Sequence, residues 1–284
     1  MKFRAACLQL QSTTDVAENI AAVERMARAA AAAGADYIQT PEMTNVLNRS
    51  RDALRGSIAN EVADPAVAAF SALSAELGII LHIGSLALVA DNRKIANRAL
   101  VFGRRGQILA RYDKIHLFDV DLANGESWRE SAVYIPGDRA VVVDLPWARL
   151  GLSICYDIRF PQLYRAQAHA GAAVLTAPAA FTRQTGEAHW HILQRARAIE
   201  SGAFVVSAAQ AGKHQDGRET FGHSMIISPW GDVLAEAGGD GPETIIADID
   251  PALSAEARQR VPALKNERPF ALPEVPQPVL RSVS

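Results

Sequence analysis

Residues 151–161 read GLSICYDIRFP, an apolar run that ends in a cysteine and gives way at once to polar residues and a proline. The letters GLSI predict a buried strand, and Pro161 suits the first turn of a helix, where its missing N–H costs nothing. Cys155 therefore belongs at a strand-to-helix turn. A thiol in that place is either a small apolar group of the core or a nucleophile beside a helix N-terminus, and this segment leaves both interpretations open.

The first half of the chain alternates short apolar strands with helices. The segments FRAACLQLQ and DYIQTPE predict strands on either side of a helix that Asp15 opens and Gly34 closes. A second helix is predicted over residues 65–77, before the strand GIILHIGSLALVA. The turn signals DNRK and RRGQ flank IANRALVFG and precede ILARYDKIH, and they predict neighbouring antiparallel strands.

The second half repeats this alternation. Helices are predicted over residues 161–170 and around HWHILQRARAIE, residues 189–200, and a tight turn is predicted at Trp230, Gly231 and Asp232. The predicted strands are AVVVDLP, LGLSICYD, AAVLTAPAA, AFVVSAAQA, HSMIISP, DVLAEAG and TIIADID. This order predicts an α/β protein whose sheets are covered by helices on their outer faces.

No linker rich in proline, glycine or serine separates the two halves. We therefore expect a single domain over residues 1–270. The end of the chain, KNERPFALPEVPQPVLRSVS, carries four prolines and no periodicity. Residues 271–284 accordingly predict an extended tail that lies on the body or reaches a neighbouring subunit.

The composition is typical of a soluble globular protein with a small partner. The 284 residues are 49% hydrophobic and 21% charged, and 29 Lys and Arg balance 31 Asp and Glu, so no charge excess attracts nucleic acid or an anionic membrane. The start, MKFRAACLQLQ, lacks the apolar core of a signal peptide, and no apolar run approaches the roughly 18 residues of a membrane span. We expect a cytoplasmic protein without a disulfide framework, since it has only Cys7 and Cys155.

Three chemically active side chains are placed at predicted strand ends. Glu42 ends the run YIQTPEM, Lys114 lies near the end of RYDKIH, and Cys155 follows GLSI. Each alone is compatible with a structural role. Together they offer a carboxylate to take a thiol proton, an ammonium to stabilise an oxyanion and a thiol to attack, which fits acyl transfer. Cys7 alternates within the first strand, and we expect it in the core.

The seven histidines offer no obvious base or metal site. His189 and His191 are two residues apart on a predicted helix and so point to different faces. His82 lies within an apolar strand, His223 precedes another, and His116 is distinguished only by the lysine before it. The histidine spacing therefore disfavours a metal hydrolase.

The motifs TPEM, RYDKIHLFDVD and GLSICYDIRFP, in this order, resemble the three signatures of the nitrilase superfamily of carbon–nitrogen hydrolases. The resemblance extends from the first strand to about Phe270 and includes RESAVYIPGD, AFTRQTGEAHWHILQRARAIES, AAQAGKH and GHSMIISPWGDVLAEAG. The segments HLFDVD, TGEAHW and GHSMIISPWG are similar to the amidase branch that contains ω-amidases and deaminated-glutathione amidases. The resemblance implies a four-layer α-β-β-α sandwich that forms a homodimer or larger homo-oligomer and needs no metal or organic cofactor.

The resemblance also implies roles for five residues. Glu42 would be the general base, Lys114 the cation that stabilises the oxyanion, and Cys155 the nucleophile. The backbone N–H of Tyr156 would complete the oxyanion hole, and RES supplies the family's second glutamate at Glu130.

In ω-amidase relatives an arginine shortly after the cysteine and residues of the AF…TG loop meet the substrate's remote carboxylate. This implies binding roles for Arg159, Phe181 and Thr185. Asp157 is predicted to be a structural partner of the turn rather than a catalyst. Two features depart from the family pattern: Asp113 places a negative charge beside the lysine, and the segment VLNRSR after TPEMTN matches no one subfamily.

These observations predict a cysteine-dependent amidase. It would hydrolyse a linear, non-peptide amide of a small carboxylate-bearing substrate, of the deaminated-glutathione or α-keto ω-amide type, through a thioester, and release ammonia or an amine. A nitrilase, an N-carbamoyl amino acid hydrolase or an aliphatic amidase would use the same scaffold. A protein of another class, a catalytically silent binding protein, is the remaining alternative.

Overall fold

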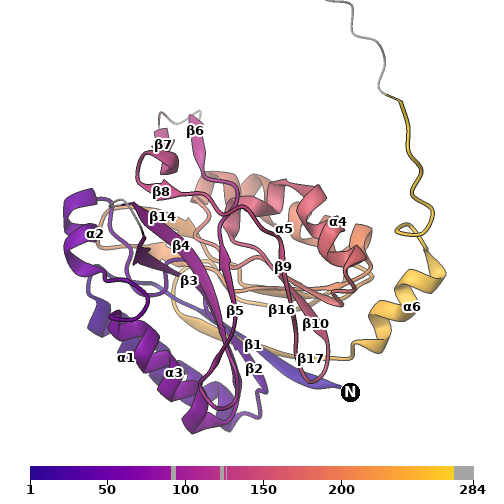
Figure 1. Cartoon of the computed structure of the whole chain (residues 1–284), viewed down its shortest axis with the longest axis horizontal. Coiled ribbons are helices and arrows are strands. Elements are labelled where there is room, and N and C mark those ends of the chain that lie inside the picture. Colours follow the sequence, from indigo (N-terminus) through magenta and orange to yellow (C-terminus); the bar gives the residue numbers. More distant parts are fainter. Residues whose placement is uncertain (91–93, 122–124, 126, 272–284) are drawn as a thin grey trace, which may run out of the picture.

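Two β-sheets packed face to face form the centre of the molecule, and helices cover their outer faces (Figure 1). This is a computed structural model of the chain, and it describes residues 1–90, 94–121, 125 and 127–271. Part of the predicted turn DNRK and residues 272–284 of the predicted tail lie outside the described residues. The layers follow the order α-β-β-α, so the predicted four-layer sandwich is confirmed.

The first sheet is built from the N-terminal half and the last strand. In the described part of the chain it is 7-stranded, with the order β17-β1-β2-β3-β4-β5 and β8 beside β4. β1, β2 and β3 run parallel, whereas β3, β4 and β5 are antiparallel neighbours, as the sequence predicted for the last two. The strands are β1 (Phe3–Gln9), β2 (Tyr37–Gln39), β3 (Ile80–Val89), β4 (Ile95–Phe102), β5 (Ile108–Asp113), β8 (Tyr134–Ile135) and β17 (Glu243–Ile249).

The second sheet is built from the C-terminal half. It is 6-stranded in the described residues, with the order β16-β15-β12-β11-β10-β9, and its parallel centre is β10, β11 and β12. Two small hairpins, β6–β7 and β13–β14, stand beside the sheets. The strands are β6 (Asp119–Asp121), β7 (Ser127–Arg129), β9 (Val141–Asp144), β10 (Arg149–Leu152), β11 (Val174–Thr176), β12 (Phe204–Ser207), β13 (Ala211–Lys213), β14 (Glu219–Phe221), β15 (Met225–Ile227) and β16 (Val233–Glu236).

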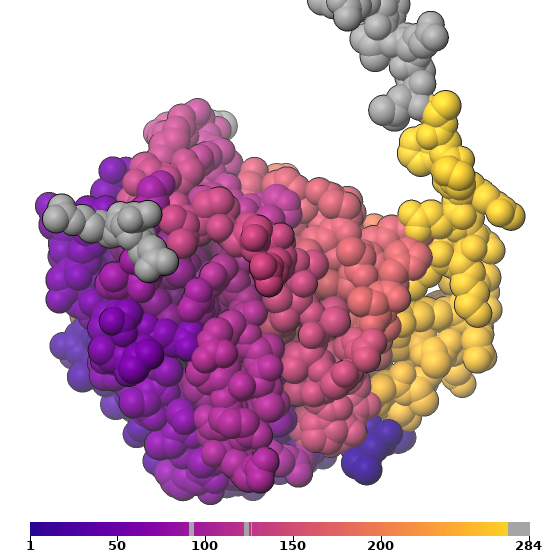
Figure 2. Space-filling view, viewed as in Figure 1, coloured from indigo at the N-terminus to yellow at the C-terminus, as the bar shows by residue number. Residues whose placement is uncertain are grey.

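The helices divide between the two outer faces. α1 and α3 cover the first sheet, and α4 and α5 cover the second, while α6 and residues 261–271 lie at one edge (Figures 1 and 2). The helices are α1 (Val16–Ala32), α2 (Arg51–Ser57), α3 (Pro65–Leu77), α4 (Pro161–His169), α5 (Arg183–Ser201) and α6 (Ala252–Arg260). None of the helices in the described ranges has the length and apolar character needed to cross a membrane.

The alternation of side chains along β1 explains how one strand serves two cores. Ala5 and Cys7 face the core between the sheets, whereas Ala6 and Leu8 face the core under α1 and α3. Cys7 is fully buried, so its predicted place in the core is confirmed. The core between the sheets contains residues of both halves of the chain. The extent of one domain over residues 1–270 stays a prediction.

Helix α5 begins earlier than the sequence predicted. Thr182 is its N-cap, and the Thr182 hydroxyl accepts a hydrogen bond from the Thr185 N–H at 3.4 Å. Gly186 interrupts the helical pattern in the sequence, but a Cβ at this position would overlap the Phe221 ring, so tertiary packing requires a glycine inside the helix. The TG end of the segment expected as the AF…TG loop is therefore in the first turns of α5, whereas Phe181 precedes the helix.

His82 lies on β3 and is fully buried. Its Nδ1 is 2.7 Å from the Tyr37 hydroxyl and 3.2 Å from Gln39 Nε2, and its Nε2 has no hydrogen-bond partner among the described residues. Burial disfavours the charged ring and lowers the pKa of His82 from 6.5 to about 3.

This histidine predicts a loss of stability in mild acid. Below its ordinary pKa the unfolded chain takes up a proton that the folded chain refuses, so the free energy of unfolding falls as the pH drops toward about 3. The loss from this group is about 2 kcal/mol between about pH 7 and pH 5. Urea unfolding at both pH values should show a smaller loss in His82→Gln than in the wild type, and equal losses would contradict the assignment.

Candidate active site

The structure brings Glu42, Lys114 and Cys155 together in the wall of one cavity. Glu42 follows β2, Lys114 comes directly after β5, and Cys155 opens a 3₁₀ turn (Cys155–Arg159) between β10 and α4. Strand ends at one edge of an α/β sheet are the usual place for function, because side chains there are carried by a rigid scaffold and open to a cleft.

The backbone is unusual at Cys155 and at the residue after Glu42. Cys155 has φ +51° and Met43, directly after Glu42, has φ +56°, and both values lie in the left-handed region that non-glycine residues seldom adopt. The Cys155 N–H donates to the Pro178 carbonyl at 2.9 Å, and the Met43 N–H donates to the Ser85 hydroxyl at 2.9 Å. These bonds hold the strained residues in place.

Close packing of β3 places the Glu42 segment. A Cβ on Gly84 would overlap the Thr40 and Pro41 carbonyl oxygens and Pro178, so only glycine allows this approach. The Gly84 N–H donates to the Thr40 hydroxyl at 3.1 Å. Because Glu42 follows directly, the glycine determines how near the carboxylate comes to the second sheet.

Lys114 lies between two carboxylates. Its Nζ is 2.8 Å from Glu42 Oε1 and 2.9 Å from Glu130 Oε2. Asn97 of β4 joins the same group, because its Nδ2 donates to Glu42 Oε1 at 2.9 Å and to Glu130 Oε1 at 3.2 Å. The second oxygen of Glu42 accepts the Ala180 N–H at 2.9 Å. The predicted second glutamate is thus in contact with the predicted lysine.

Burial disfavours the charged forms of Glu42, Lys114 and Cys155, and the charged neighbours of each group then determine in which direction its pKa shifts. Burial alone would raise the pKa of Glu42, but the Lys114 ammonium and hydrogen bonds from Lys114, Cys155 and Asn97 hold it below its usual value. Burial alone would lower the pKa of Lys114, but Glu130 and Glu42 raise it well above its usual value. Burial raises the pKa of the Cys155 thiol, the Glu42 carboxylate raises it further, and Lys114 only partly opposes them.

The resting site therefore holds a neutral thiol, an ionised carboxylate and an ammonium. A preformed thiolate is disfavoured, so the thiol can act as a nucleophile only as its proton leaves. Glu42 is the hydrogen-bonded carboxylate that can receive that proton. The charge arrangement suits general-base activation of Cys155.

The cavity has a volume of about 420 Å³, which suits a small molecule. Of the residues predicted to act in the site, all but Arg159 line it. Phe118, Trp128 and Phe181 give it aromatic walls, and four arginines also line it: Arg49, Arg51, Arg129 and Arg218. Met43, the last residue of TPEM, and the segment after it form part of the wall through Val46, Leu47, Asn48 and α2.

Arg159 lies outside the lining of the cavity. Its guanidinium is 5.9 Å from the Tyr156 ring centre and 5.4 Å from that of Phe181, and its Nη2 is 3.2 Å from His189 Nδ1. Phe181 and Thr185 do line the cavity. Arg159 therefore contacts two residues that line the cavity but does not line it itself.

Two residues that sequence reasoning missed belong to the site. Asn97 is a fully buried polar side chain in the apolar strand IANRALVF, and that contrast is a signal in the sequence. Arg218 lines the cavity, with its guanidinium 5.2 Å from the Trp128 ring centre and 3.0 Å from the Asp216 carboxylate. Nothing in the local sequence distinguishes Arg218, which lies in a polar turn.

Asp157 is a structural residue, as predicted. Its carboxylate accepts hydrogen bonds from the Ile154 N–H at 2.9 Å, the Tyr112 hydroxyl at 2.7 Å and the His116 N–H at 3.0 Å. These bonds tie the turn that carries Cys155 to the segment that carries Lys114. His116 contributes to this link through its backbone N–H.

The negative charge of Asp113, beside the lysine in the sequence, is paired with an arginine in the fold. Asp113 forms two hydrogen bonds with Arg98, at 2.7 and 2.8 Å, and neighbouring side chains on a strand point to opposite faces. The charge of Asp113 is therefore neutralised away from Lys114.

Comparisons with known proteins agree with this geometry. Residues 4–259 match the family model described as carbon-nitrogen hydrolase. A deaminated glutathione amidase of Synechocystis sp. is 38% identical, covering 93% of this chain and 97% of its own length. The human omega-amidase NIT2 is 36% identical over 94% of this chain and 95% of its own length. The crystal structure of Saccharomyces cerevisiae Nit3, a member of the nitrilase superfamily, has 30% sequence identity and a TM-score of 0.83. The match covers 92% of this chain and 94% of Nit3. The chain therefore belongs to the carbon–nitrogen hydrolase family of the nitrilase superfamily and is a hydrolase of non-peptide carbon–nitrogen bonds in amides.

Proposed function

We propose that this protein is a cysteine-dependent amidase that acts on small carboxylate-bearing amides through a thioester. The observation that carries the proposal is the convergence of a thiol, an ionised carboxylate and an ammonium in the wall of one small cavity. Glu42 takes the proton of Cys155 as its sulfur attacks the amide carbonyl. Lys114 and the backbone N–H of Tyr156 then stabilise the oxyanion, at a place where burial strengthens electrostatic interactions.

The same groups complete the reaction. Glu42 returns the proton to the leaving nitrogen, ammonia or an amine departs, and a water attacks the thioester with Glu42 again as base. Glu130 acts with Lys114, since it accepts hydrogen bonds from the ammonium at 3.1 and 2.9 Å and keeps it charged and oriented.

We propose that the substrate's remote carboxylate binds Arg218. This guanidinium lines the cavity and lies 3.0 Å from the Asp216 carboxylate. A guanidinium has five N–H donors, so it can contact Asp216 and still bind a carboxylate. Phe181 and Thr185 would contact the body of the substrate. The sequence-based assignment of the carboxylate to Arg159 stays a prediction.

Paired variants distinguish the two arginines. Arg218→Met should raise KM for α-ketoglutaramate about 10- to 100-fold with a smaller change in kcat, because hydrogen bonds to charged groups contribute about 1.5–3 kcal/mol. Arg159→Met is the matched comparison, and a neutral aliphatic amide is the control substrate whose KM should not change. A KM increase confined to Arg159→Met would assign the carboxylate to Arg159.

A substrate panel tests the function itself. We expect catalytic efficiency to be highest for deaminated glutathione and α-ketoglutaramate, and lower for a nitrile, a carbamoyl amino acid and a simple aliphatic amide. A nitrile or a carbamoyl compound at the top of the series would replace the proposal with the corresponding alternative.

We also propose that the protein forms a homodimer or larger homo-oligomer. Large apolar side chains are exposed on α5 and around β15 and β16, among them Ile192 at 71% and Trp230 at 56%. Light scattering on the purified protein measures the subunit number, and a monomer would overturn this proposal. The cytoplasmic location expected from the sequence stays a prediction.

A further inference from the structure

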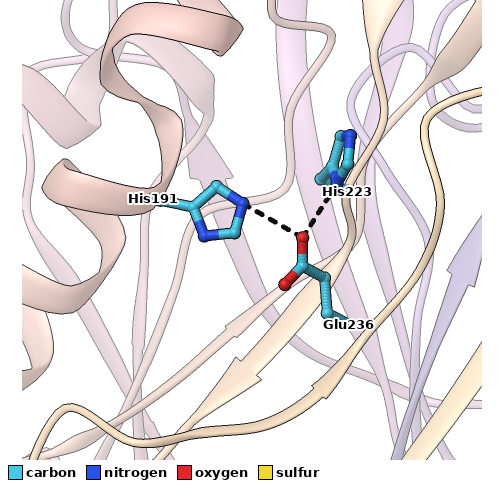
Figure 3. Close-up of side chains that lie close together, drawn as sticks. All are labelled: His191, His223 and Glu236. Carbon is cyan, nitrogen blue, oxygen red and sulfur yellow. Dashed lines mark hydrogen bonds and ion pairs between the residues drawn. The ribbon is translucent and has the colours of Figure 1, made fainter.

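A second group of chemically active side chains lies apart from the residues that line the cavity. His191 of α5, His223 of the segment between β14 and β15, and Glu236 of β16 converge on one point (Figure 3). Glu236 Oε1 is 3.0 Å from His191 Nε2 and 2.8 Å from His223 Nδ1. The spacing of the histidines along the sequence does not reveal this group, because its members come from three separate elements.

The geometry is close to that of a zinc site. Zinc binds imidazole nitrogen and carboxylate oxygen at about 2.0–2.2 Å in tetrahedral geometry, so ligand atoms around it lie roughly 3.3–3.5 Å apart. The three ligand atoms here all lie within 4.8 Å of one another. Small side-chain rotations would therefore admit the ion between them, with each imidazole binding it through an unprotonated ring nitrogen and keeping its proton on the other nitrogen.

The backbone holds His223 in position independently of the other two ligands. His223 has φ +54°, its N–H donates to the Gly238 carbonyl at 3.2 Å, and its carbonyl accepts the Trp190 indole N–H at 2.7 Å. Its ring stacks on Phe221, with ring centres 4.3 Å apart. A residue kept in a strained conformation with a fixed ring is typical of a site with a function.

The ligand types select the metal class. Two imidazoles and one carboxylate suit zinc and similar transition metals, whereas magnesium and calcium prefer oxygen ligands alone. The side chains of His191, His223 and Glu236 are 42%, 29% and 29% exposed, so an ion can enter and keep a water as its fourth ligand.

We propose that His191, His223 and Glu236 form a zinc site with three protein ligands. The ion would join α5 to the edge of the second sheet. It would act close to the cavity wall, because Trp190, beside His191, packs on Phe181 with ring centres 5.0 Å apart. The site is independent of the amidase proposal, since none of its ligands lines the cavity.

Zinc titration of the full chain, free of any affinity tag, tests the site by calorimetry. The variants are His191→Gln, Glu236→Gln and His223→Asn, because asparagine tolerates a left-handed backbone. His169→Gln is the matched control, since His169 is an exposed histidine 2.8 Å from a single carboxylate, Glu267. Cys155→Ala is titrated as well, because a thiol also binds zinc.

We expect about one zinc per chain in the wild type, in Cys155→Ala and in His169→Gln at micromolar free zinc, with binding about 100-fold weaker or lost in each of the three cluster variants. Zinc should raise the melting temperature of the first three proteins and not of the cluster variants. The proposal is overturned if the wild type binds no zinc, if the cluster variants bind it as the wild type does, or if Cys155→Ala alone abolishes binding.

Discussion

Cys155→Ala is expected to abolish amide hydrolysis while leaving the protein folded. Removal of a nucleophile costs on the order of 10⁶-fold in kcat when no other group can replace it, and Cys7, the only other cysteine, is fully buried in the core between the sheets. The substitution removes one sulfur from a side chain that is 7% exposed, so packing changes little. Ammonia release from α-ketoglutaramate measures the activity, and circular dichroism with a thermal melt checks the fold.

Thiol labelling supplies the control. Iodoacetamide should modify Cys155 far faster than Cys7, because Cys155 lines the cavity and Glu42 can accept its proton. Mass spectrometry of the wild type quenched during turnover should find the acyl group on the peptide that contains Cys155. Appreciable turnover by Cys155→Ala would refute the mechanism, and equal labelling of the two cysteines would favour a silent binding protein.

Lys114→Met should reduce both activity and stability. The variant loses the charge that we propose stabilises the oxyanion, and loss of a single such donor costs about 10²–10³-fold in kcat. It also leaves the carboxylates of Glu42 and Glu130 without the ammonium between them, and Glu42 is only 4% exposed. Removing one partner of a buried ion pair costs about 3–5 kcal/mol, measurable by urea unfolding.

The double variant Lys114→Met with Glu130→Gln separates the two effects. It should recover part of the stability, because only one buried carboxylate remains, but none of the activity.

The pH profile of Lys114→Met adds a further check. The Lys114 ammonium lowers the pKa of Glu42, so this pKa should rise in Lys114→Met. Glu42 would then be protonated, and unable to act as base, up to a higher pH, and the acid limb of the kcat/KM profile should shift to higher pH. An unchanged acid limb would show that Glu42 is not the base.

Local structure followed from local sequence signals. Asp15 caps α1, and Pro65–Leu77 forms the predicted helix, because capping and helix termination depend on neighbouring residues. The early start of α5 was missed because Gly186 disfavours a helix by itself, and only its contact with Phe221 on another element makes the glycine necessary.

The sequence by itself determined the class of fold, the family signatures and three chemically suited residues at strand ends. Only the tertiary structure decided which side chains meet. Lys114 contacts Glu42 across 72 residues, Asn97 contacts Glu42, and Arg218 lines the cavity whereas Arg159 does not. His191, His223 and Glu236 converge from three separate elements. The physical reason is the distance along the sequence over which the two kinds of interaction act. Strands and helices depend on steric and hydrogen-bonding preferences of adjacent residues, whereas a site depends on how two sheets pack and on which strand ends that packing brings together.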